Sequence, residues 1–301
     1  MGMKVKTMLL AACLCLPQAA LAQNAFAQET DNYKAAYLGP EGTYTEEAAQ
    51  FWFQDGEELI PKPNATDTVS AVQEGEADFA VIAQENTLGG VVPGNLDALI
   101  QAEDLYVVGE VVLPISQTLM GVPGAALSDI KTVCSHPQAL KQSAGWMAQN
   151  LPGAKTREMD STAAAASYVA TEADPSIAAV AAPGAAELYG LEVLAENVQI
   201  TDANKTRFYV LSTMPVVEYG LSNAVFVVTC DGSMIDDVMA VLYDSGLETV
   251  SIHDRPEGSR LGRYHYVIEV EDEYGIADEQ IEEVCAMEGV RFAGCFAAVE
   301  K

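Results

Sequence analysis

Basic residues are scarce in this chain of 301 residues, where 15 lysines and arginines stand against 44 aspartates and glutamates. The formal net charge at pH 7 is −29, so the surface repels the phosphates of nucleic acids and anionic membranes. The composition therefore predicts a protein that binds no nucleic acid and, in its mature form, no membrane. It would also repel an anionic substrate unless the few cations lie where that substrate binds.

The patterns of several common sites are lacking too. The three histidines, His136, His253 and His265, show neither the order of a hydrolase triad nor a paired metal-ligand spacing. No two cysteines have the spacing C-x-x-C, and no glycine-rich phosphate loop ends in Lys-Ser or Lys-Thr. The sequence thus predicts no metal site and no nucleotide-binding loop of that type.

Few cysteines are available for cross-links. Beyond residue 27 the chain has Cys134, Cys230, Cys285 and Cys295. An oxidising compartment would permit a disulfide, with Cys285 and Cys295 nearest in sequence, and buried free thiols fit the same residues. Both interpretations stay open.

Long hydrophobic runs are absent, apart from a short one near the N-terminus. Lys4 and Lys6 precede a nearly apolar stretch at residues 7–16, and Ala20-Leu21-Ala22 offers a small-residue cleavage site before Gln23. This is the three-part pattern of a secretory signal peptide, and the stretch is too short for an ordinary membrane span. We therefore expect residues 1–27 to be a signal peptide and the mature chain to be exported to the periplasm.

Other interpretations of the N-terminus remain. A second cleavage point follows Ala27. Residues 10–13 could instead be a lipoprotein box that anchors the chain at Cys13, or the first residues could form a buried helix. In each case these residues are left out of the fold prediction.

Short apolar strands alternate with helical stretches from residue 34 to about residue 211. This alternation predicts an α/β fold with a mostly parallel sheet. The expected strands are 35–38, 79–83, 106–113, 132–134, 177–181 and 207–211, and the expected helices are 46–54, 96–102, 137–150, 163–171 and 185–189.

The chain changes character near residues 212–221, where Pro215 and Gly220 indicate a linker. After it we expect strand 224–229, helix 235–244, strands 249–254 and 264–270, helix 278–287 and strand 290–298. The order βαββαβ is typical of a ferredoxin-like unit. Two domains are therefore expected, at 33–213 and 222–301.

Hydroxyl residues recur where the predicted helices begin. Thr43 follows a glycine-rich turn, Ser135 ends a strand, and Ser161 and Thr162 precede an alanine-rich helix. The free N–H groups and the dipole of a helix start attract carboxylates, although ordinary N-capping explains any one of these residues alone. Their repetition indicates a shared anion site.

Two further segments carry polar groups at strand ends. Glu85-Asn86-Thr87 ends a buried strand abruptly, at the kind of edge where α/β folds bind ligands. Asn204-Lys205-Thr206-Arg207-Phe208 places a hydroxyl between two of the scarce cations. Lys205 and Arg207 could hold substrate carboxylates, but alternation along a strand would send Thr206 to the opposite face.

Together, these segments resemble the prephenate dehydratase family. The similar stretches occur in the family's order and cover about residues 35–211: Gly39-Pro40-Glu41-Gly42-Thr43-Tyr44-Thr45, Glu85-Asn86-Thr87, Ser135-His136-Pro137-Gln138, Asp160-Ser161-Thr162-Ala163, Tyr189-Gly190-Leu191 and Asn204-Lys205-Thr206-Arg207-Phe208. The Thr-Arg-Phe element alone is weak, whereas the whole set is specific.

The resemblance implies a two-lobed catalytic region of the periplasmic-binding-protein type with its site in the cleft. It implies that Thr206 is the catalytic hydroxyl, that no metal or organic cofactor is used, and that prephenate loses water and carbon dioxide to give phenylpyruvate. The expected catalytic positions are Thr206, Glu85, Asn86, Ser135 and Gln142, and the expected substrate-binding positions are Thr43, Thr87, Ser161, Thr162 and Arg207. A buried, protonated Glu85 is the alternative proton donor, and Arg207 could equally brace the cleft through a salt bridge.

The C-terminal unit resembles an ACT domain, which in this family binds phenylalanine as a feedback inhibitor. The expected effector positions are Gly232, Met234, Arg255 and Pro256, although the flanking residues depart from the family pattern at Ser233, His253 and Asp254. A homodimer or higher homo-oligomer is implied. Arogenate as substrate, a non-catalytic exported protein that binds an aromatic acid, and a purely regulatory protein are the alternatives.

Overall fold

A computed structural model describes residues 33–53, 58–201, 203–216 and 220–300. The expected signal peptide at 1–27, its cleavage points and Cys13 lie outside the described residues. Within the described ranges, no helix has the length and apolar character needed to cross a membrane. Nor does this part of the chain hold a group of three or more side chains able to bind a metal ion.

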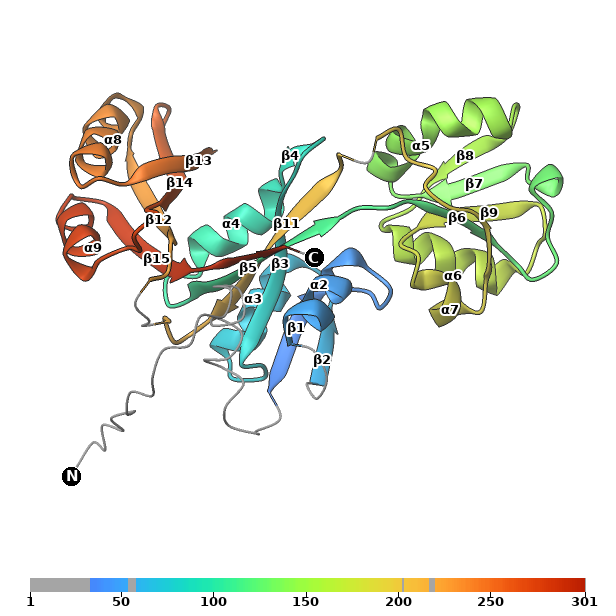
Figure 1. Ribbon diagram of the computed structural model, residues 1–301, viewed down its shortest axis with the longest axis horizontal. Helices are drawn as coiled ribbons and strands as arrows, with labels where there is room; N and C mark the ends of the chain where they lie inside the picture. Colours follow the sequence, from blue (N-terminus) through green and yellow to red (C-terminus); the bar gives the residue numbers. More distant parts are fainter. Residues whose placement is uncertain (1–32, 54–57, 202, 217–219, 301) are drawn as a thin grey trace.

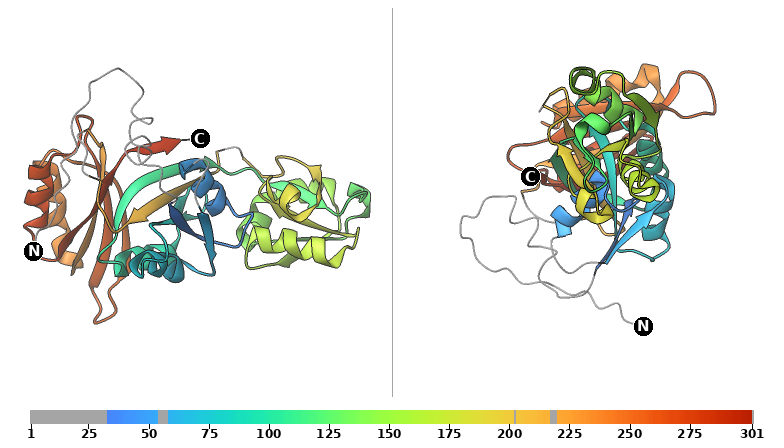
Figure 2. Two further views of the ribbon diagram at one scale, coloured as in Figure 1. Left: turned by 90° about the horizontal axis from the view of Figure 1, so that it is seen from below. Right: turned by 90° about the vertical axis from the view of Figure 1, so that its right-hand side faces the viewer.

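Three units lie in a row, with the first lobe in the centre, the second lobe at one end and the C-terminal unit at the other (Figures 1 and 2). The chain passes between the two lobes twice, at residues 115–117 and again through residues 196–201 and 203–204. This is the two-lobed α/β architecture that the sequence predicts, followed by a βαββαβ unit.

The first lobe is built on a mixed sheet in the order β16-β5-β11-β3-β1-β2, with β4 paired to β3. Helix α2 covers one face of the sheet, and helices α3 and α4 cover the other. The elements are β1 (Lys34–Leu38), α2 (Tyr44–Phe53), β2 (Glu58–Lys62), α3 (Ala65–Gln73), β3 (Phe79–Asn86), β4 (Gly90–Val91), α4 (Pro93–Gln101), β5 (Tyr106–Pro114), β11 (Lys205–Ser212) and β16 (Ala298–Glu300).

The expectation of a mostly parallel sheet is only partly correct. Strands β1, β2 and β3 are parallel, but β11 returns from the second lobe and runs antiparallel to both β3 and β5. A strand that re-enters a lobe from the far end must run against its neighbours. This return strand carries Thr206.

The second lobe has a smaller sheet in the order β10-β6-β9-β7-β8. Alanine-rich α6 packs on one side of it, and α5 packs on the other. The elements are β6 (Thr118–Gly121), η1 (Leu127–Asp129), β7 (Thr132–Ser135), α5 (Pro137–Asn150), β8 (Lys155–Glu158), α6 (Thr162–Glu172), β9 (Ile177–Ala181), α7 (Ala185–Tyr189) and β10 (Glu192–Ala195).

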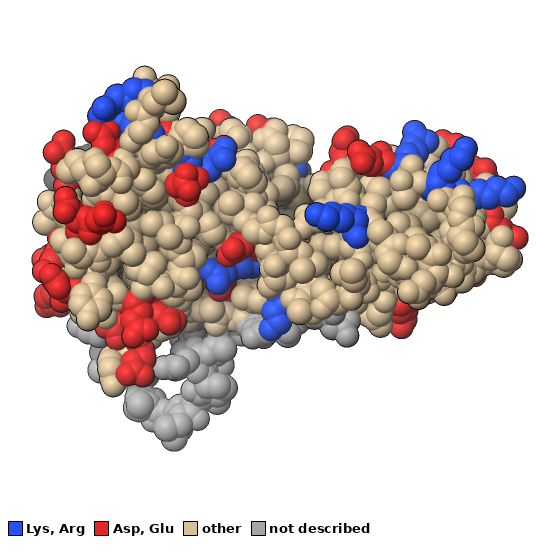
Figure 3. All heavy atoms as spheres, turned by 90° about the horizontal axis from the view of Figure 1, so that it is seen from above, with Lys and Arg blue, Asp and Glu red and all other residues tan. Residues whose placement is uncertain are grey.

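The C-terminal unit is a sheet in the order β13-β14-β12-β15 with two helices on one face. Part of the other face packs against α3 and α4 of the first lobe. The elements are β12 (Asn223–Asp231), η2 (Gly232–Met234), α8 (Ile235–Asp244), β13 (Glu248–Pro256), β14 (Arg263–Glu271), α9 (Asp278–Cys285) and β15 (Val290–Phe296). Acidic side chains are frequent over this end of the molecule (Figure 3).

All four described cysteines are free, so the alternative of a Cys285–Cys295 disulfide is wrong. Cys134, Cys230 and Cys295 are buried. Burial raises the pKa of the Cys295 thiol to about 12. The thiols act as small apolar groups in the cores.

The last strand ties the C-terminal unit to the first lobe. After β15 the chain forms β16, which pairs in parallel with β5 at the edge of the first lobe's sheet. Phe296 and Val299 are buried in the first lobe's two cores. The sequence-based domain boundary at residues 213–222 therefore separates two units that share a sheet.

Gly294 permits the closest approach between these units. Its φ is +128°, and a Cβ there would lie 2.1 Å from the Val107 carbonyl oxygen. We predict that Gly294→Ala lowers the free energy of unfolding by more than about 2 kcal/mol, because strain and overlap act together. Urea unfolding followed by circular dichroism measures the change.

Gly153→Ala is the matched control, since Gly153 has φ +93° but open space around it. It carries only the conformational penalty, and we expect a loss of about 1 kcal/mol. The contact surface between the C-terminal unit and the first lobe is called the seam below. Equal losses in the two variants would contradict a tight contact at this seam.

Candidate active site

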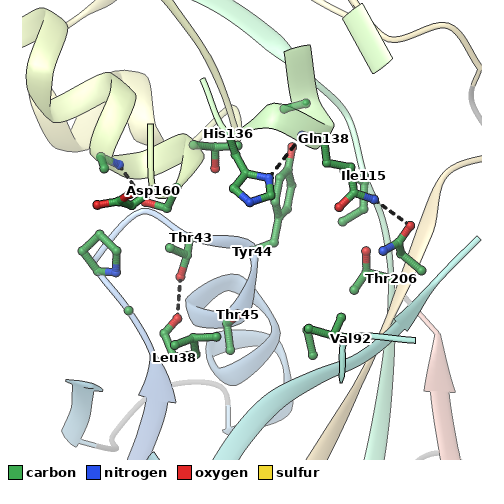
Figure 4. Close-up of a pocket in the computed structure, with 18 of the residues that line it drawn as sticks. Leu38, Thr43, Tyr44, Thr45, Val92, Ile115, His136, Gln138, Asp160 and Thr206 are labelled. Carbon is green, nitrogen blue, oxygen red and sulfur yellow. Dashed lines mark hydrogen bonds between the residues drawn. The ribbon is translucent and has the colours of Figure 1, made fainter. Parts of the chain in front are cut away.

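A cavity of about 520 Å³ lies between the two lobes. One wall comes from the first lobe, at the start of α2 and the ends of β3 and β11, and the other from the starts of α5 and α6 (Figure 4). Both passages of the chain between the lobes also contribute, through Ile115, Gln117 and Asn204.

Thr206 lines this cavity from the middle of the first lobe's sheet. Its strand β11 is paired on both sides, with Thr206 opposite Asn86 of β3 and Leu113 of β5. Phe208 lines the cavity from the same face of the strand. The backbone of a residue in a doubly paired strand has little freedom, so the Cα of Thr206 is held in a fixed place at the cavity.

The start of α2 presents Thr43, Tyr44 and Thr45 to the cavity (Figure 4). Thr43 caps the helix, because its hydroxyl accepts a hydrogen bond from the Glu46 N–H at 3.3 Å. Glu46 in turn accepts from the Gly42 N–H. Tyr44 donates its hydroxyl proton to the Ser116 carbonyl oxygen, and burial raises the pKa of its phenol.

The starts of α5 and α6 face the cavity from the second lobe. Ser161 caps α6 by accepting from the Ala164 N–H at 2.9 Å, and His136 caps α5 by accepting from the Gln138 N–H at 3.3 Å. Burial lowers the pKa of His136 below its usual 6.5, against the opposite effect of Asp160, so the ring is neutral at pH 7. Three helix starts from two lobes therefore face one space, each with first-turn N–H groups that need partners.

Amide side chains join the lobes around this space. The Asn86 carbonyl oxygen accepts from Gln138 Nε2 of the second lobe at 2.9 Å, and also from the Gly89 N–H at 2.6 Å. The Gln142 carbonyl oxygen accepts from Gln117 at 3.3 Å and Asn204 at 3.2 Å, one on each passage between the lobes. Rotation of one lobe against the other would break these bonds.

No lysine or arginine is among the described residues that line the cavity. Asp160 is the one carboxylate there. Lys205 and Arg207, the two cations that could hold substrate carboxylates, are not among these lining residues. Helix starts and hydroxyls take the place that cations would hold.

Arg207 lies on the opposite face of β11 from Thr206, as strand alternation requires. Its Nε is 3.2 Å from Glu110 Oε2, and its Nη1 is hydrogen-bonded to Glu269 of the C-terminal unit. It was expected to contact substrate, but it does not line the cavity. Of the two roles predicted for it, the geometry fits the salt bridge.

Three other predicted positions lie outside the cavity lining. Glu85 alternates with Asn86 along β3 and faces the C-terminal unit, where His253 Nε2 is 3.8 Å from its carboxylate. Ser135 is fully buried and donates to the Val180 carbonyl oxygen. Thr87 donates to the Ala203 carbonyl oxygen at 2.9 Å and thereby braces the loop before β11.

The remaining predicted positions divide in two. Asn86, Gln142, Thr43, Ser161 and Thr162 line the cavity together with Thr206. The expected effector positions are in the C-terminal unit, where Gly232 and Met234 belong to η2, and Arg255 and Pro256 end β13. Arg255 makes a two-point ion pair with Asp97 of the first lobe, at 2.7 and 2.8 Å.

Sequence reasoning missed several lining residues. His136, Gln138, Tyr44 and Asp160 stand within the motifs that carried the resemblance, next to positions that were chosen. Gln117 has no motif around it, because it reaches the cavity only through the path of the chain between the lobes.

The comparisons with known proteins agree with this geometry. The family model described as prephenate dehydratase matches residues 35–215. A prephenate dehydratase of Amycolatopsis methanolica is 35% identical over 277 residues, which are 89% of this chain and 89% of that protein.

Two solved structures are similar over most of the chain. Prephenate dehydratase from Arthrobacter aurescens in complex with L-Phe has a TM-score of 0.79 at 30% identity, covering 88% of this chain and 90% of that one. GqqA, described as a novel type of quorum quenching acylase, has a TM-score of 0.76 at 28% identity, covering 88% and 98%. The family model matches more than half of this chain, and a relative at 35% identity covers most of it. The chain therefore belongs to the prephenate dehydratase family.

Proposed function

We propose that this chain is an enzyme that converts prephenate into phenylpyruvate, water and carbon dioxide, without a metal or organic cofactor. The observation that carries the proposal is the Thr206 hydroxyl, which a doubly paired strand presents to a cavity between two lobes. Membership of the prephenate dehydratase family supports the reaction class.

Helix starts would bind the two carboxylates of prephenate. Thr43 at α2, and Ser161 and Thr162 at α6, offer hydroxyls beside first-turn N–H groups on opposite walls of the cavity. Each helix start carries about half a positive charge. Anion binding can therefore proceed without the lysine or arginine that the described cavity lining lacks.

The reaction needs alignment and help for the leaving group. The bond between the ring and its carboxylate breaks, the electron pair enters the ring, and the C–O bond on the far side breaks to release hydroxide. The departing hydroxide takes up a proton from solvent to become water, and aromatisation drives the change. Thr206 donates a hydrogen bond to the departing oxygen, while Asn86 and Gln142 fix the lobes around the ring.

Arogenate is the alternative substrate, with an ammonium group where prephenate has a keto group. Asp160 bears on this choice, because a carboxylate in the cavity attracts an ammonium and repels a second anion. Asp160 directly precedes Ser161, the N-cap of α6, and the start of α6 is one of the helix starts proposed to bind a substrate carboxylate. Prephenate remains the proposed substrate, on the family assignment.

Two alternative functions, an acylase and a binding protein without catalysis, can be tested with the same purified protein. An acylase needs an activated nucleophile, and within the described residues no hydrogen bond joins a cavity hydroxyl to His136. A binding protein without catalysis would leave prephenate unchanged. Formation of phenylpyruvate from prephenate by the leader-free chain, followed by its absorbance in alkali, separates the dehydratase from both.

Regulation and assembly are further proposals. We propose an ACT-like role for the C-terminal unit, with phenylalanine as the effector and a homodimer as the assembly. The L-Phe bound to the Arthrobacter aurescens relative supports phenylalanine as the ligand to test. Measuring turnover with and without phenylalanine, and mass by light scattering, tests both.

Export is proposed from the sequence of residues 1–27 alone. If the signal peptide is cleaved, the mature N-terminus is Gln23 or Gln28. We predict that the full chain, expressed in a bacterium with a secretion pathway, is recovered outside the cytoplasm with one of these two masses. A cytoplasmic protein that keeps Met1, or one lipidated at Cys13, would contradict the proposal.

Removal of the Thr206 hydroxyl is predicted to lower turnover severely without changing the fold. Thr206→Ala should lose about 10²–10⁴-fold in kcat, the usual contribution of positioned acid assistance. Thr206→Ser keeps the hydroxyl and should retain most of the activity. Thr171→Ala is the control, because Thr171 is exposed on α6 and bonds only to its own helix.

Thr206→Ala with nearly normal kcat and an unchanged circular dichroism spectrum would refute the catalytic assignment. The assay is phenylpyruvate release from prephenate by all four proteins at equal concentration.

Neutralising Asp160 is predicted to change the preference between the two acids. Asp160→Asn should shift the ratio of kcat/KM values from arogenate toward prephenate by about fivefold, because one charge pair near 4 Å is worth about 1 kcal/mol in a water-like medium. Initial rates with both acids, measured side by side, give the ratio. A ratio that stays constant would remove Asp160 from substrate selection.

A further inference from the structure

A buried group of charges lies directly behind the proposed catalytic strand. Arg207 is next to Thr206 in β11, and its guanidinium lies between Glu110 of β5 and Glu269 of β14. The side chains of Glu110 and Glu269 are only 4% and 2% exposed. The Tyr209 hydroxyl donates to the same Glu269 oxygen at 2.9 Å.

The group joins two units that the sequence separates. Glu110, Arg207 and Tyr209 belong to the first lobe's sheet, whereas Glu269 belongs to the sheet of the C-terminal unit. Arg207 therefore has one partner on its own sheet and one across the seam. A shift of β14 against β11 would therefore displace Glu269 from Arg207, the residue that follows Thr206.

Packing alone does not account for these charges. Burying an ion pair usually stabilises a fold no more than apolar residues of the same size would, and removing one partner is costly. The neighbouring residues in the seam, such as Val225 and Val267, show that apolar side chains are used there. What the charged group adds is a fixed geometry for Arg207, through a planar fork that can bind two carboxylates.

We infer that Arg207, Glu110 and Glu269 form a positioning network for Thr206, through which the C-terminal unit holds the catalytic strand in its active register. The inference rests on the proposed function. These three are positioning residues, since none of them lines the cavity.

The network also holds one carboxyl group more than its single cation can balance. Burial, and then the nearby Glu269, raise the pKa of Glu110 to about 8, and burial raises that of Glu269 as well. Among the described residues, Glu110 Oε2 accepts no hydrogen bond, and its contact with Arg207 Nε at 3.2 Å is an ion pair alone. The other groups facing the network are Tyr209, Glu85 of β3, Asn223 of β12, and His253 of β13 against Glu85.

Loss of the Glu110 proton should disturb the network. An ordinary glutamate ionises near 4.5, so the folded chain binds the extra proton between that pH and about 8. Stability contributed by the protonated form therefore falls as pH rises through this range. Above about pH 8, a second full negative charge competes with Glu269 for Arg207, and kcat should fall.

The test compares Glu269→Gln with Asp97→Asn in the full mature chain. Asp97 binds Arg255 across the same seam and takes no part in the ion pairs of Arg207, so it controls for a general loss of contact between the units. We expect Glu269→Gln to lower kcat about tenfold or more while KM changes less than about threefold, because small misplacements of a reacting group are costly. Asp97→Asn should leave kcat within about twofold of the wild type.

Two further variants keep the test decisive if Glu269→Gln folds poorly. Tyr209→Phe removes only the hydrogen bond to Glu269 and should lower kcat about threefold, in the same direction and again with little change in KM. Glu110→Gln cannot ionise and should abolish the fall in kcat above about pH 8.

The outcomes are distinguishable. If the wild-type chain does not convert prephenate, both the proposed function and this inference are wrong. An active wild type, together with a folded Glu269→Gln that loses no more kcat than Asp97→Asn, overturns the positioning network alone. So does a pH profile that Glu110→Gln leaves unchanged.

Discussion

The structure depends on strand β11, whose two faces contact different parts of the molecule. Strand β11 returns from the second lobe and is paired on both sides, so its side chains alternate between fixed directions. Thr206 and Phe208 face the cavity, while Arg207 and Tyr209 face the C-terminal unit. The two lobes, the cavity and the third unit all meet at this strand, so chemistry and interdomain contact are linked by a single peptide segment.

The cavity must bind an anionic substrate although the chain as a whole is strongly negative. A protein of net charge −29 offers little attraction to a dianion at long range, and no cation lines the described part of its cavity. Short-range N–H groups at helix starts need no counter-charge on the surface, and they are already oriented before substrate enters. The amide bonds from Asn86 and Gln142 across the lobes keep these helix starts facing each other.

Periodicity and motifs predicted much of this from the sequence. The expected strands and helices of the first region and the βαββαβ order are confirmed. Exposed β8 and the short β2 were missed, because edge strands without an apolar face give no alternating signal. The family resemblance located Thr206, Asn86 and Gln142 but grouped them with Glu85, Ser135 and Thr87, since neighbours in sequence can face opposite sides of a sheet. The pairing of β16 with β5 depends on the tertiary path and could not be foreseen.

The most direct measurement is a crystal structure of the leader-free chain with an unreactive prephenate analogue that keeps the ring hydroxyl. The account predicts the Thr206 Oγ1 within about 3 Å of that hydroxyl oxygen, and both carboxylates at helix starts on the two walls of the cavity. An analogue bound elsewhere, or seated in the cavity with its ring hydroxyl turned away from Thr206, would contradict it.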